Sequence, residues 1–312
     1  MDRIKVVSPC SSANLGSGFD VFGLALEVFH DTLSAELTDG GTTIEVAGLD
    51  ADKIPTDLKR NSAGLVAKRL VEDREIGVKI KIEKGIPPKM GLGSSGASAA
   101  ACAVALDSVF DLGLSQNELV TAAAIGETAA AGASHPDNVS ASILGGFTMV
   151  QARGESLHVV RLDPPPNLKV ALAMPLIETP EGKTAMARAI LPNSVPFGSA
   201  ISNVRNAASI VAGFHLGDVD MIGRGMEDVI VEPARMRLIP NYEAVKRAAL
   251  GSGASGVAIS GAGPAVIAIV DDTEVSAVDV AGAMRDAFLS ASIQCESCCS
   301  KPSPEGTVKV PW

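Results

Sequence analysis

The sequence predicts an α+β protein made of two domains. Its 312 residues suit one large domain or two ordinary ones. Strand and helix patterns are interleaved without a regular strand–helix–strand period, which favours α+β units over a parallel sheet. Pro164-Pro165-Pro166 interrupts the chain near its middle, because three prolines continue neither a helix nor a central strand. We expect an N-terminal domain over residues 1–163 and a C-terminal domain over residues 164–312.

The first half carries both strand and helix patterns. Val78–Ile82 alternates between apolar and charged residues, which predicts a half-buried strand. Further strands are predicted at Ile4–Ser8, Leu33–Thr38, Thr42–Val46, Ile143–Val150 and His158–Leu162. Helices are predicted over Asn61–Asp73, over the alanine-rich Ser94–Phe110, and from the capping box Ser115-Gln116-Asn117-Glu118 to about Ala131.

The second half alternates in the same irregular way. Strands are predicted at Lys169–Met174, Val257–Ser260 and Ala265–Val270. Helices are predicted at Thr184–Leu191, Ser199–His215, Val219–Met226, Tyr242–Leu250 and Val275–Ala287. The last two strands flank a glycine cluster, Ser260-Gly-Ala-Gly-Pro264. This cluster is either a tight hairpin or a segment whose backbone approaches another loop closely.

Composition argues against several classes of partner. The formal net charge is -10, which repels nucleic-acid backbones, and aromatic residues make up only 3% of the chain, which argues against base-stacking platforms. The N-terminus lacks the apolar core of a signal peptide, and the most apolar helical stretch, Ala97–Leu106, is too short to span a bilayer. We therefore expect a cytoplasmic protein with an aliphatic, alanine-rich core and no nucleic-acid or membrane partner.

The five cysteines do not predict a disulfide scaffold, because their number is odd and the chain is long. Cys295, Cys298 and Cys299 resemble a metal or redox motif. A zinc site would need four ligands, and no second pair lies at a suitable spacing. The alternative is a late strand with buried thiols.

The strongest local signal is Gly91-Leu92-Gly93-Ser94-Ser95-Gly96, placed between a predicted strand and a predicted helix. A helix N-terminus offers unpaired amides and partial positive charge, and glycines let the backbone approach a phosphate closely. Ser94 and Ser95 add hydroxyl groups, and Lys89 could reach the same anion. The segment predicts a phosphate-binding loop.

Two other nucleotide-binding motifs are disfavoured here, and one structural alternative remains. The segment also fits the loose dinucleotide fingerprint GxGxxG, but no second strand with an acidic residue follows at the distance that a nicotinamide cofactor site requires. No GxxxxGK[ST] motif of a Walker loop occurs. The simplest alternative is a helix that merely begins after a flexible loop.

Three segments together resemble the motifs of the GHMP kinases, in the family's order and spacing. They are Pro9–Asp20, Gly91–Ser98 and Ser260–Pro264. The resemblance implies an N-terminal domain like the second domain of ribosomal protein S5 and a ferredoxin-like C-terminal domain. It also implies ATP and Mg²⁺ as cofactors, a small-molecule acceptor and, as in many members, a homodimer.

Within the family, the chain resembles the branch that phosphorylates the hydroxyl of L-homoserine in threonine biosynthesis. The similar segments are Ala133–Asn138, Gly145–Met149 and Ile230–Pro240. Many relatives carry a small residue where this chain has Lys89, which leaves the role of Lys89 open. Other acceptors in the family, such as mevalonate, shikimate or a sugar, and a non-enzymatic nucleotide-binding role, are the competing hypotheses.

The resemblance assigns residues to each part of the reaction. The implied nucleotide-binding residues are Lys89, Met90, Gly91, Leu92, Gly93, Ser94, Ser95, Gly96, Ala97, Ser98, Thr184, Gly261 and Gly263. Ser95 and Glu127 are the implied metal ligands. The implied substrate-binding residues are Asn14, Asp20, His135, Asn138, Arg188 and Arg235.

The chemistry of homoserine fits these side chains. Arg188 and Arg235 would clamp its carboxylate, and Asp20 would pair with its ammonium group. Asn14, Asp20 and Asn138 would orient the hydroxyl, and we expect no strong protein base. Without the resemblance, Asn14 and Asp20 are equally well explained as turn residues, and the arginines as solvated surface residues.

Overall fold

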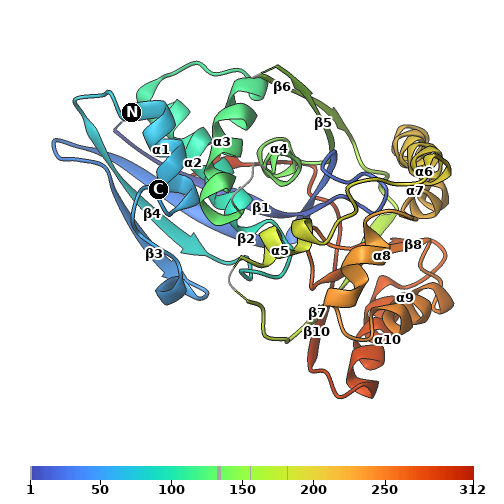
Figure 1. Ribbon diagram of the computed structural model, residues 1–312. Coiled ribbons are helices and arrows are strands. Elements are labelled where there is room, and N and C mark those ends of the chain that lie inside the picture. The colour runs from blue at the N-terminus through green and yellow to red at the C-terminus, as the bar shows by residue number, and fades with distance from the viewer. Residues whose placement is uncertain (1, 132–134, 155, 181) are drawn as a thin grey trace.

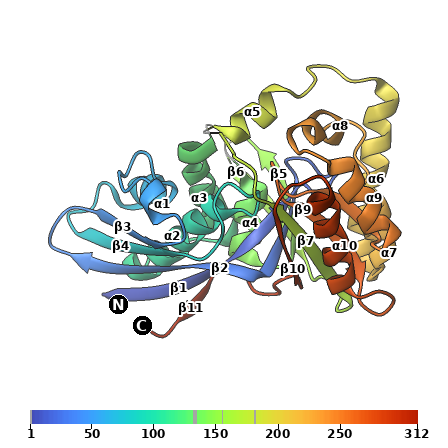
Figure 2. The same cartoon turned by 90° about the horizontal axis from the view of Figure 1, so that it is seen from below.

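The computed structural model describes residues 2–131, 135–154, 156–180 and 182–312. Ala133 and Ser134 of the segment 133–138 lie outside the described residues. The chain forms two β-sheets with helices packed on them (Figures 1 and 2), which confirms the predicted α+β class.

The first sheet has seven strands, in the order β11-β1-β2-β4-β3, with β5 pairing β2 and β6 pairing β5. Their bounds are β1 Arg3–Ala13, β2 Phe22–Thr38, β3 Thr43–Gly48, β4 Gly77–Lys84, β5 Phe147–Arg153, β6 Ser156–Leu162 and β11 Val308–Val310. Strands β3 and β4 are parallel and the other pairs are antiparallel. Strand β4 alternates between buried and exposed residues as predicted.

Four helices cover one face of the first sheet (Figure 1). They are α1 Ser62–Val71, α2 Ser94–Phe110, α3 Gln116–Ala131 and α4 Pro136–Leu144. Helices α2 and α4 contact β1 and β2, and α1 and α3 pack on α2. The core between sheet and helices is aliphatic and rich in alanine, as the composition predicted. Small side chains let α2 lie close to the sheet.

The second sheet has four antiparallel strands in the order β10-β7-β9-β8. Their bounds are β7 Leu168–Pro175, β8 Gly256–Ile259, β9 Val266–Asp271 and β10 Cys295–Ser300. The helices of this half are α5 Lys183–Ala189, α6 Phe197–Leu216, α7 Val219–Gly225, α8 Glu232–Arg235, α9 Tyr242–Gly251 and α10 Ala277–Ser290; short 3-10 turns form at Ala51–Lys53 and Met236–Leu238. Helices α9 and α10 share a core with one face of this sheet, and α6 and α7 share a core with the other.

The two sheets share one core. Leu24 of β2 and Phe147 of β5 belong to the same buried cluster as Leu172 of β7 and Ile267 of β9. Phe147 also stacks on Phe214 of α6, with ring centroids 4.0 Å apart. The assignment of residues 1–163 and 164–312 to separate domains remains a prediction. Strand β11 belongs to the second of these ranges but lies in the first sheet.

Several sequence-based expectations were wrong in detail. Residues 143 and 144 end helix α4, so the predicted strand Ile143–Val150 begins only at Phe147. Strand β2 begins at Phe22, whereas the predicted strand begins at Leu33. The prediction missed the first half because its residues are buried without alternation. Strand β11 was not predicted. Cys295–Ser300 is a strand, but the thiols of Cys295, Cys298 and Cys299 are free and only partly buried.

Candidate active site

The predicted phosphate loop connects β4 to the N-terminus of α2. Gly91 and Gly93 have φ angles of +87° and +68°, which residues with a side chain rarely adopt. A Cβ on Gly91 would lie 2.2 Å from the carbonyl oxygen of Ser260, and one on Gly93 would lie 2.2 Å from Ser11 Oγ. Glycine at both positions therefore lets the loop pack against the 260–264 segment and against β1.

The first turn of α2 is open to an anion. Gly93 is the N-cap residue, and no side chain caps the helix. The amide of Ala97 donates to the carbonyl of Gly93 at 2.8 Å, so the intrahelical bonds begin there. The amides of Ser94, Ser95 and Gly96 precede that point and have no carbonyl within the helix to bond. These amides and the positive end of the helix dipole favour a phosphate group.

A buried ion pair, Asp31–Lys84, holds the loop to the sheet. The Asp31 carboxylate accepts hydrogen bonds from Lys84 Nζ, from Ser98 Oγ at 2.9 Å and from the amides of Gly85–Ile86 at 3.0 and 3.1 Å. Lys84 also donates to the carbonyl of Ser94 and to Ser98 Oγ, both at 2.8 Å. Burial lowers the pKa of Lys84, and the neighbouring Asp31 opposes that shift. Neither residue was predicted as part of the site.

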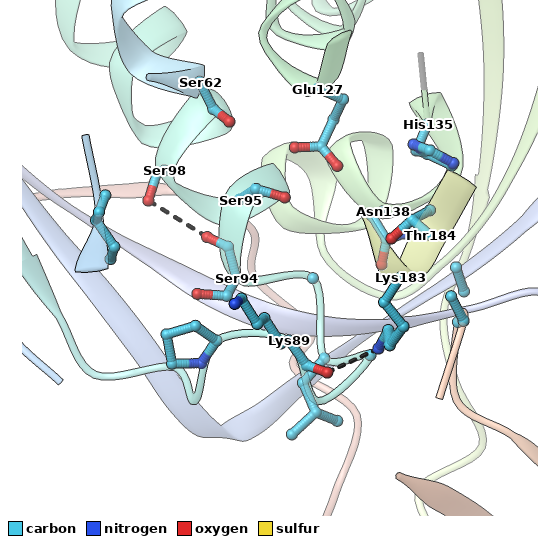
Figure 3. Close-up of a pocket in the computed structure, with 18 of the residues that line it drawn as sticks. Ser62, Lys89, Ser94, Ser95, Ser98, Glu127, His135, Asn138, Lys183 and Thr184 are labelled. Carbon is cyan, nitrogen blue, oxygen red and sulfur yellow. Dashed lines mark hydrogen bonds between the residues drawn. The ribbon is translucent and has the colours of Figure 1, made fainter. Parts of the chain in front are cut away.

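A cavity of about 530 Å³ lies beside this loop. Figure 3 shows Ser62 and Ser98 on one side of it and His135, Asn138 and Thr184 on the other, with Ser94 and Ser95 between. Residues 53–55 and 59–62 also line the cavity and were not predicted. The cavity thus joins the phosphate loop to the side chains that were predicted to bind the acceptor.

The turn between β1 and β2 places two predicted residues at the cavity. Asn14 and Asp20 have φ angles of 74° and 58°, a conformation that Asn and Asp tolerate better than most residues. Asn14 Nδ2 donates to the carbonyl of Gly261 at 3.0 Å, and Asn14 Oδ1 accepts from the Asp20 amide at 3.0 Å. Asn14 therefore ties the first motif to the third.

Asp20 faces two arginines. Arg188 of α5 binds its carboxylate through two hydrogen bonds of 2.8 and 2.9 Å. Arg235 donates to the carbonyls of Ala187 and Gly261 and is buried. The ring of Phe19 lies 5.5 Å from the Arg188 guanidinium and 4.8 Å from that of Arg235. The two guanidinium groups and one carboxylate form a cluster suited to a zwitterion.

His135 and Asn138, two of the predicted substrate-binding residues, lie at the N-terminus of helix α4. His135 is the N-cap residue of α4, and Asn138 lies in its first turn because Pro136 starts the helix. Asn138 Oδ1 accepts a hydrogen bond from Ser11 Oγ at 3.0 Å. Both His135 and Asn138 line the cavity.

Glu127 of α3 is buried, and its Oε1 atom has no hydrogen-bond partner among the described residues. Burial raises the pKa of its carboxyl to about 7, although a hydrogen bond with Ser95 lowers it. An unpartnered buried carboxylate oxygen is costly unless a ligand satisfies it. Its place beside Ser95 and the phosphate loop fits a cation that also contacts phosphate.

Asp137 of α4 was not predicted, although it lines the cavity. Its carboxylate accepts from the Asn138 amide at 2.9 Å. Burial raises the pKa of this carboxyl to about 7, and the nearby Asp20 adds to the shift. Asp137 thus places a carboxyl group that is readily protonated near the predicted acceptor site.

Lys183, at the start of α5, was also missed. Its ammonium group donates to the carbonyls of Lys89, at 2.7 Å, and Gly263, so it connects the phosphate loop to the 260–264 segment (Figure 3). Burial, together with the positive charges of Arg235 and Lys89, lowers the pKa of Lys183 to about 7. Lys89 itself is exposed and lines the cavity.

Most of the predicted site residues line the cavity. Those that line it are Asn14, Asp20, Lys89, Gly91, Leu92, Gly93, Ser94, Ser95, Ser98, Glu127, His135, Asn138, Thr184, Arg235 and Gly261. Five other predicted residues do not line it: Met90, Gly96, Ala97, Arg188 and Gly263. Met90 and Ala97 pack in the core that both sheets share.

No group of three or more His, Cys, Asp or Glu side chains in the described part of the chain could hold a metal ion. No helix there is long and apolar enough to cross a membrane. A cation site at Glu127 would therefore need oxygen ligands from Ser95, phosphate and water.

The sequence matches the family of GHMP kinases in both halves. Residues 60–146 match the GHMP kinases N terminal domain, and residues 210–288 match the GHMP kinases C terminal domain. The phosphate loop, the cavity and these matches agree, and the chain belongs to the GHMP kinase family. Membership of this kinase family implies the use of ATP.

Similar proteins narrow the class further. A homoserine kinase of Thermoplasma acidophilum is 44% identical over 276 residues, 87% of this chain and 86% of the relative. A homoserine kinase of Halorubrum lacusprofundi is 44% identical over 290 residues, 93% of this chain and 94% of the relative. The crystal structure of homoserine kinase from Cytophaga hutchinsonii superimposes with a TM-score of 0.91 at 34% identity, covering 99% of this chain and 98% of that one.

Proposed function

We propose that the chain phosphorylates the side-chain hydroxyl of L-homoserine with ATP, as a homoserine kinase. The observation that carries this proposal is the cavity, which is lined by the phosphate loop and by Asp20 and Arg235, with Arg188 bonded to Asp20 behind it. The loop suits a nucleotide triphosphate, and the cluster suits an amino-acid zwitterion. The relatives that cover most of the chain carry the same activity in their names.

The nucleotide would lie along the side of the cavity that holds the phosphate loop. The first-turn amides of Ser94, Ser95 and Gly96 would bind its phosphates. Its nucleoside would extend toward residues 53–55 and 59–62, which line the cavity beyond the loop and which no short motif announced. Ser98 would support the loop indirectly, because its hydroxyl is engaged by Asp31 and Lys84.

Glu127 and Ser95 would hold Mg²⁺. The unpartnered Oε1 atom of Glu127 supports this assignment, since Mg²⁺ prefers one or two carboxylates together with phosphate oxygens and water. When bound, the ion would neutralise charge on the β- and γ-phosphates. Glu127→Gln should raise the Mg²⁺ concentration needed for half-maximal activity at least about tenfold. Unchanged Mg²⁺ dependence would refute the assignment.

The acceptor would bind between the arginines and Asp20. Its carboxylate would lie against the guanidinium groups of Arg188 and Arg235, and its ammonium group would lie against Asp20. Arg188 and Asp20 bind each other, so the substrate would replace both partners at once. A zwitterion can do this, whereas mevalonate, shikimate or a sugar lacks the ammonium group.

The transfer itself needs position more than acid–base power. The homoserine hydroxyl oxygen forms a bond to the γ-phosphorus while the bond to the bridging oxygen breaks and its electron pair leaves with ADP. Asn14 and Asn138 would orient the hydroxyl. Its proton would pass to a phosphate oxygen, because an asparagine stands at the position where other members of the family carry an aspartate base.

One measurement tests the proposal directly. ADP release is followed in the presence of ATP and Mg²⁺, with and without L-homoserine, against a panel of mevalonate, shikimate and a sugar. We expect release that depends on homoserine. Release with another acceptor would replace the substrate, and ATP binding without transfer to any acceptor would point to a non-enzymatic member. A homodimer and a cytoplasmic location remain predictions.

A further inference from the structure

Lys183 is a cation at the cavity that the similarity to known motifs did not assign. It precedes Thr184 at the start of α5 and lines the cavity on the side of Asn138 and His135 (Figure 3). The phosphate loop lies across from it, since Lys183 Nζ bonds the carbonyl of Lys89. Lys183 therefore lies between the proposed phosphate site and the proposed acceptor site.

The ammonium group of Lys183 keeps capacity for a ligand. It has three N–H donors, and its two hydrogen bonds go to the backbone carbonyls of Lys89 and Gly263. It takes part in none of the ion pairs among the described residues. By contrast, Lys84 is neutralised by Asp31. Lys183 is thus a half-buried cation without a bonded counter-ion.

The charges around Lys183 are also positive. Apart from burial, the charges of Arg235 and Lys89 have the largest effect on the pKa of Lys183, and both disfavour its protonated form. An arrangement of like charges on a chain with a net charge of -10 costs energy in the free protein. An anion with several negative oxygens, placed among these three cations, would offset that cost.

We propose that Lys183 is a further catalytic residue that contacts the terminal phosphate of ATP during transfer. The proposal rests on the ATP site proposed above. A cation at the junction of the two sites stabilises the charge on the transferring phosphoryl group, which this class of reaction requires. The alternative is that Lys183 only pins α5 to the two loops through its carbonyl contacts.

Binding of ATP and ADP separates the two roles, because ADP lacks the terminal phosphate. The affinities of both nucleotides are measured by calorimetry with Mg²⁺ and without acceptor, for the wild type, Lys183→Met and Lys183→Gln. Gln can still donate to the carbonyls but carries no charge. We expect both variants to lose about 10- to 100-fold in ATP affinity and less than about threefold in ADP affinity. Lys183→Arg should recover most of the ATP affinity.

Lys169→Met is the matched control, because Lys169 lies in β7 and does not line the cavity. It should bind both nucleotides as the wild type does. Equal losses of ATP and ADP affinity in Lys183→Gln, together with a lower melting temperature, would assign Lys183 to the structural role and overturn the inference. Unchanged ATP affinity would overturn it too. A chain that binds ATP but phosphorylates another acceptor would overturn the proposed substrate and leave this inference standing.

Discussion

Two carboxylate–cation pairs lie beside the cavity and differ in how they are embedded. The side chains of Lys84 and Asp31 are 3% and 0% exposed, whereas those of Arg188 and Asp20 are 37% and 38% exposed. Both oxygens of Asp31 are occupied by fixed groups of the protein, including backbone amides. Burial and additional hydrogen bonds make Asp31–Lys84 a framework pair. Because Asp20–Arg188 lacks both, this pair is open to exchange with a ligand.

Breaking the framework pair should have the largest effect. Lys84→Met leaves the Asp31 carboxylate buried without its cation, so we expect the free energy of unfolding to fall by about 3–5 kcal/mol. Urea unfolding at pH 7 measures this loss. Lys79→Met is the matched control on the exposed face of β4, where Lys79 pairs with Glu45, and it should unfold like the wild type. A Lys84→Met protein as stable as this control would contradict the comparison.

Asp137 is a buried carboxylate like Asp31, but it belongs to none of the ion pairs among the described residues. Its pKa rises from 3.8 to about 7 on folding, so the folded protein holds this proton more tightly than the unfolded chain. Burial of Asp137 therefore costs no stability below about pH 4, and the cost grows as the pH rises to about 7.

Asp137→Asn removes this cost and keeps the acceptor for the Asn138 amide. We expect the variant to be more stable than the wild type by up to about 4 kcal/mol at pH 8, with the advantage vanishing near pH 4. Unfolding curves of ligand-free protein across this range measure it. A difference that does not change with pH would show that folding does not raise the pKa of Asp137.

The Asp20–Arg188 pair should contribute more to substrate binding than to stability. Arg188→Met should raise KM for homoserine about 100-fold, because a charged contact to the carboxylate is lost. The free energy of unfolding should change by less than about 1 kcal/mol, as expected for a pair that is more than a third exposed. Arg224→Met on the surface of α7 is the control. A stability loss like that of Lys84→Met would mean that Asp20–Arg188 is framework as well.

Asn138 gives the smallest expected effect. Asn138→Ala keeps the Cβ that lies against Gly96 and removes the amide that accepts from Ser11. We expect kcat to fall about tenfold while the KM for ATP stays the same, since the amide orients only the hydroxyl of the acceptor. Steady-state kinetics with both substrates measure this. Full kcat in the variant would remove Asn138 from the mechanism.

Local sequence patterns predicted the elements whose signals lie in neighbouring residues. The alternation of β4 and the capping box of α3 were confirmed, because each depends on neighbouring residues alone. Helix α4 was missed, since no helix was predicted directly before the strand Ile143–Val150. Long-range bonds such as Ser142 to the carbonyl of Pro9 support the helix.

The candidate site shows the same limit. The three matched motifs led to most residues of the cavity, whereas Asp31 and Lys84 are 53 residues apart, and no local pattern announces their pairing. Lys183 was missed for a related reason, because its partners, the carbonyls of Lys89 and Gly263, are backbone groups that any residue could supply. Such pairings become visible only when the strands are in place.

Strand β11 has a consequence for how the chain is made. Residues 308–310 pair with residues 5–7 of β1, so β1 pairs with a strand that is translated only after all strands of the second sheet (Figure 2). Until then, β1 presents an unpaired edge, which is the kind of surface that binds other strands. The first sheet is therefore completed only after translation of the second.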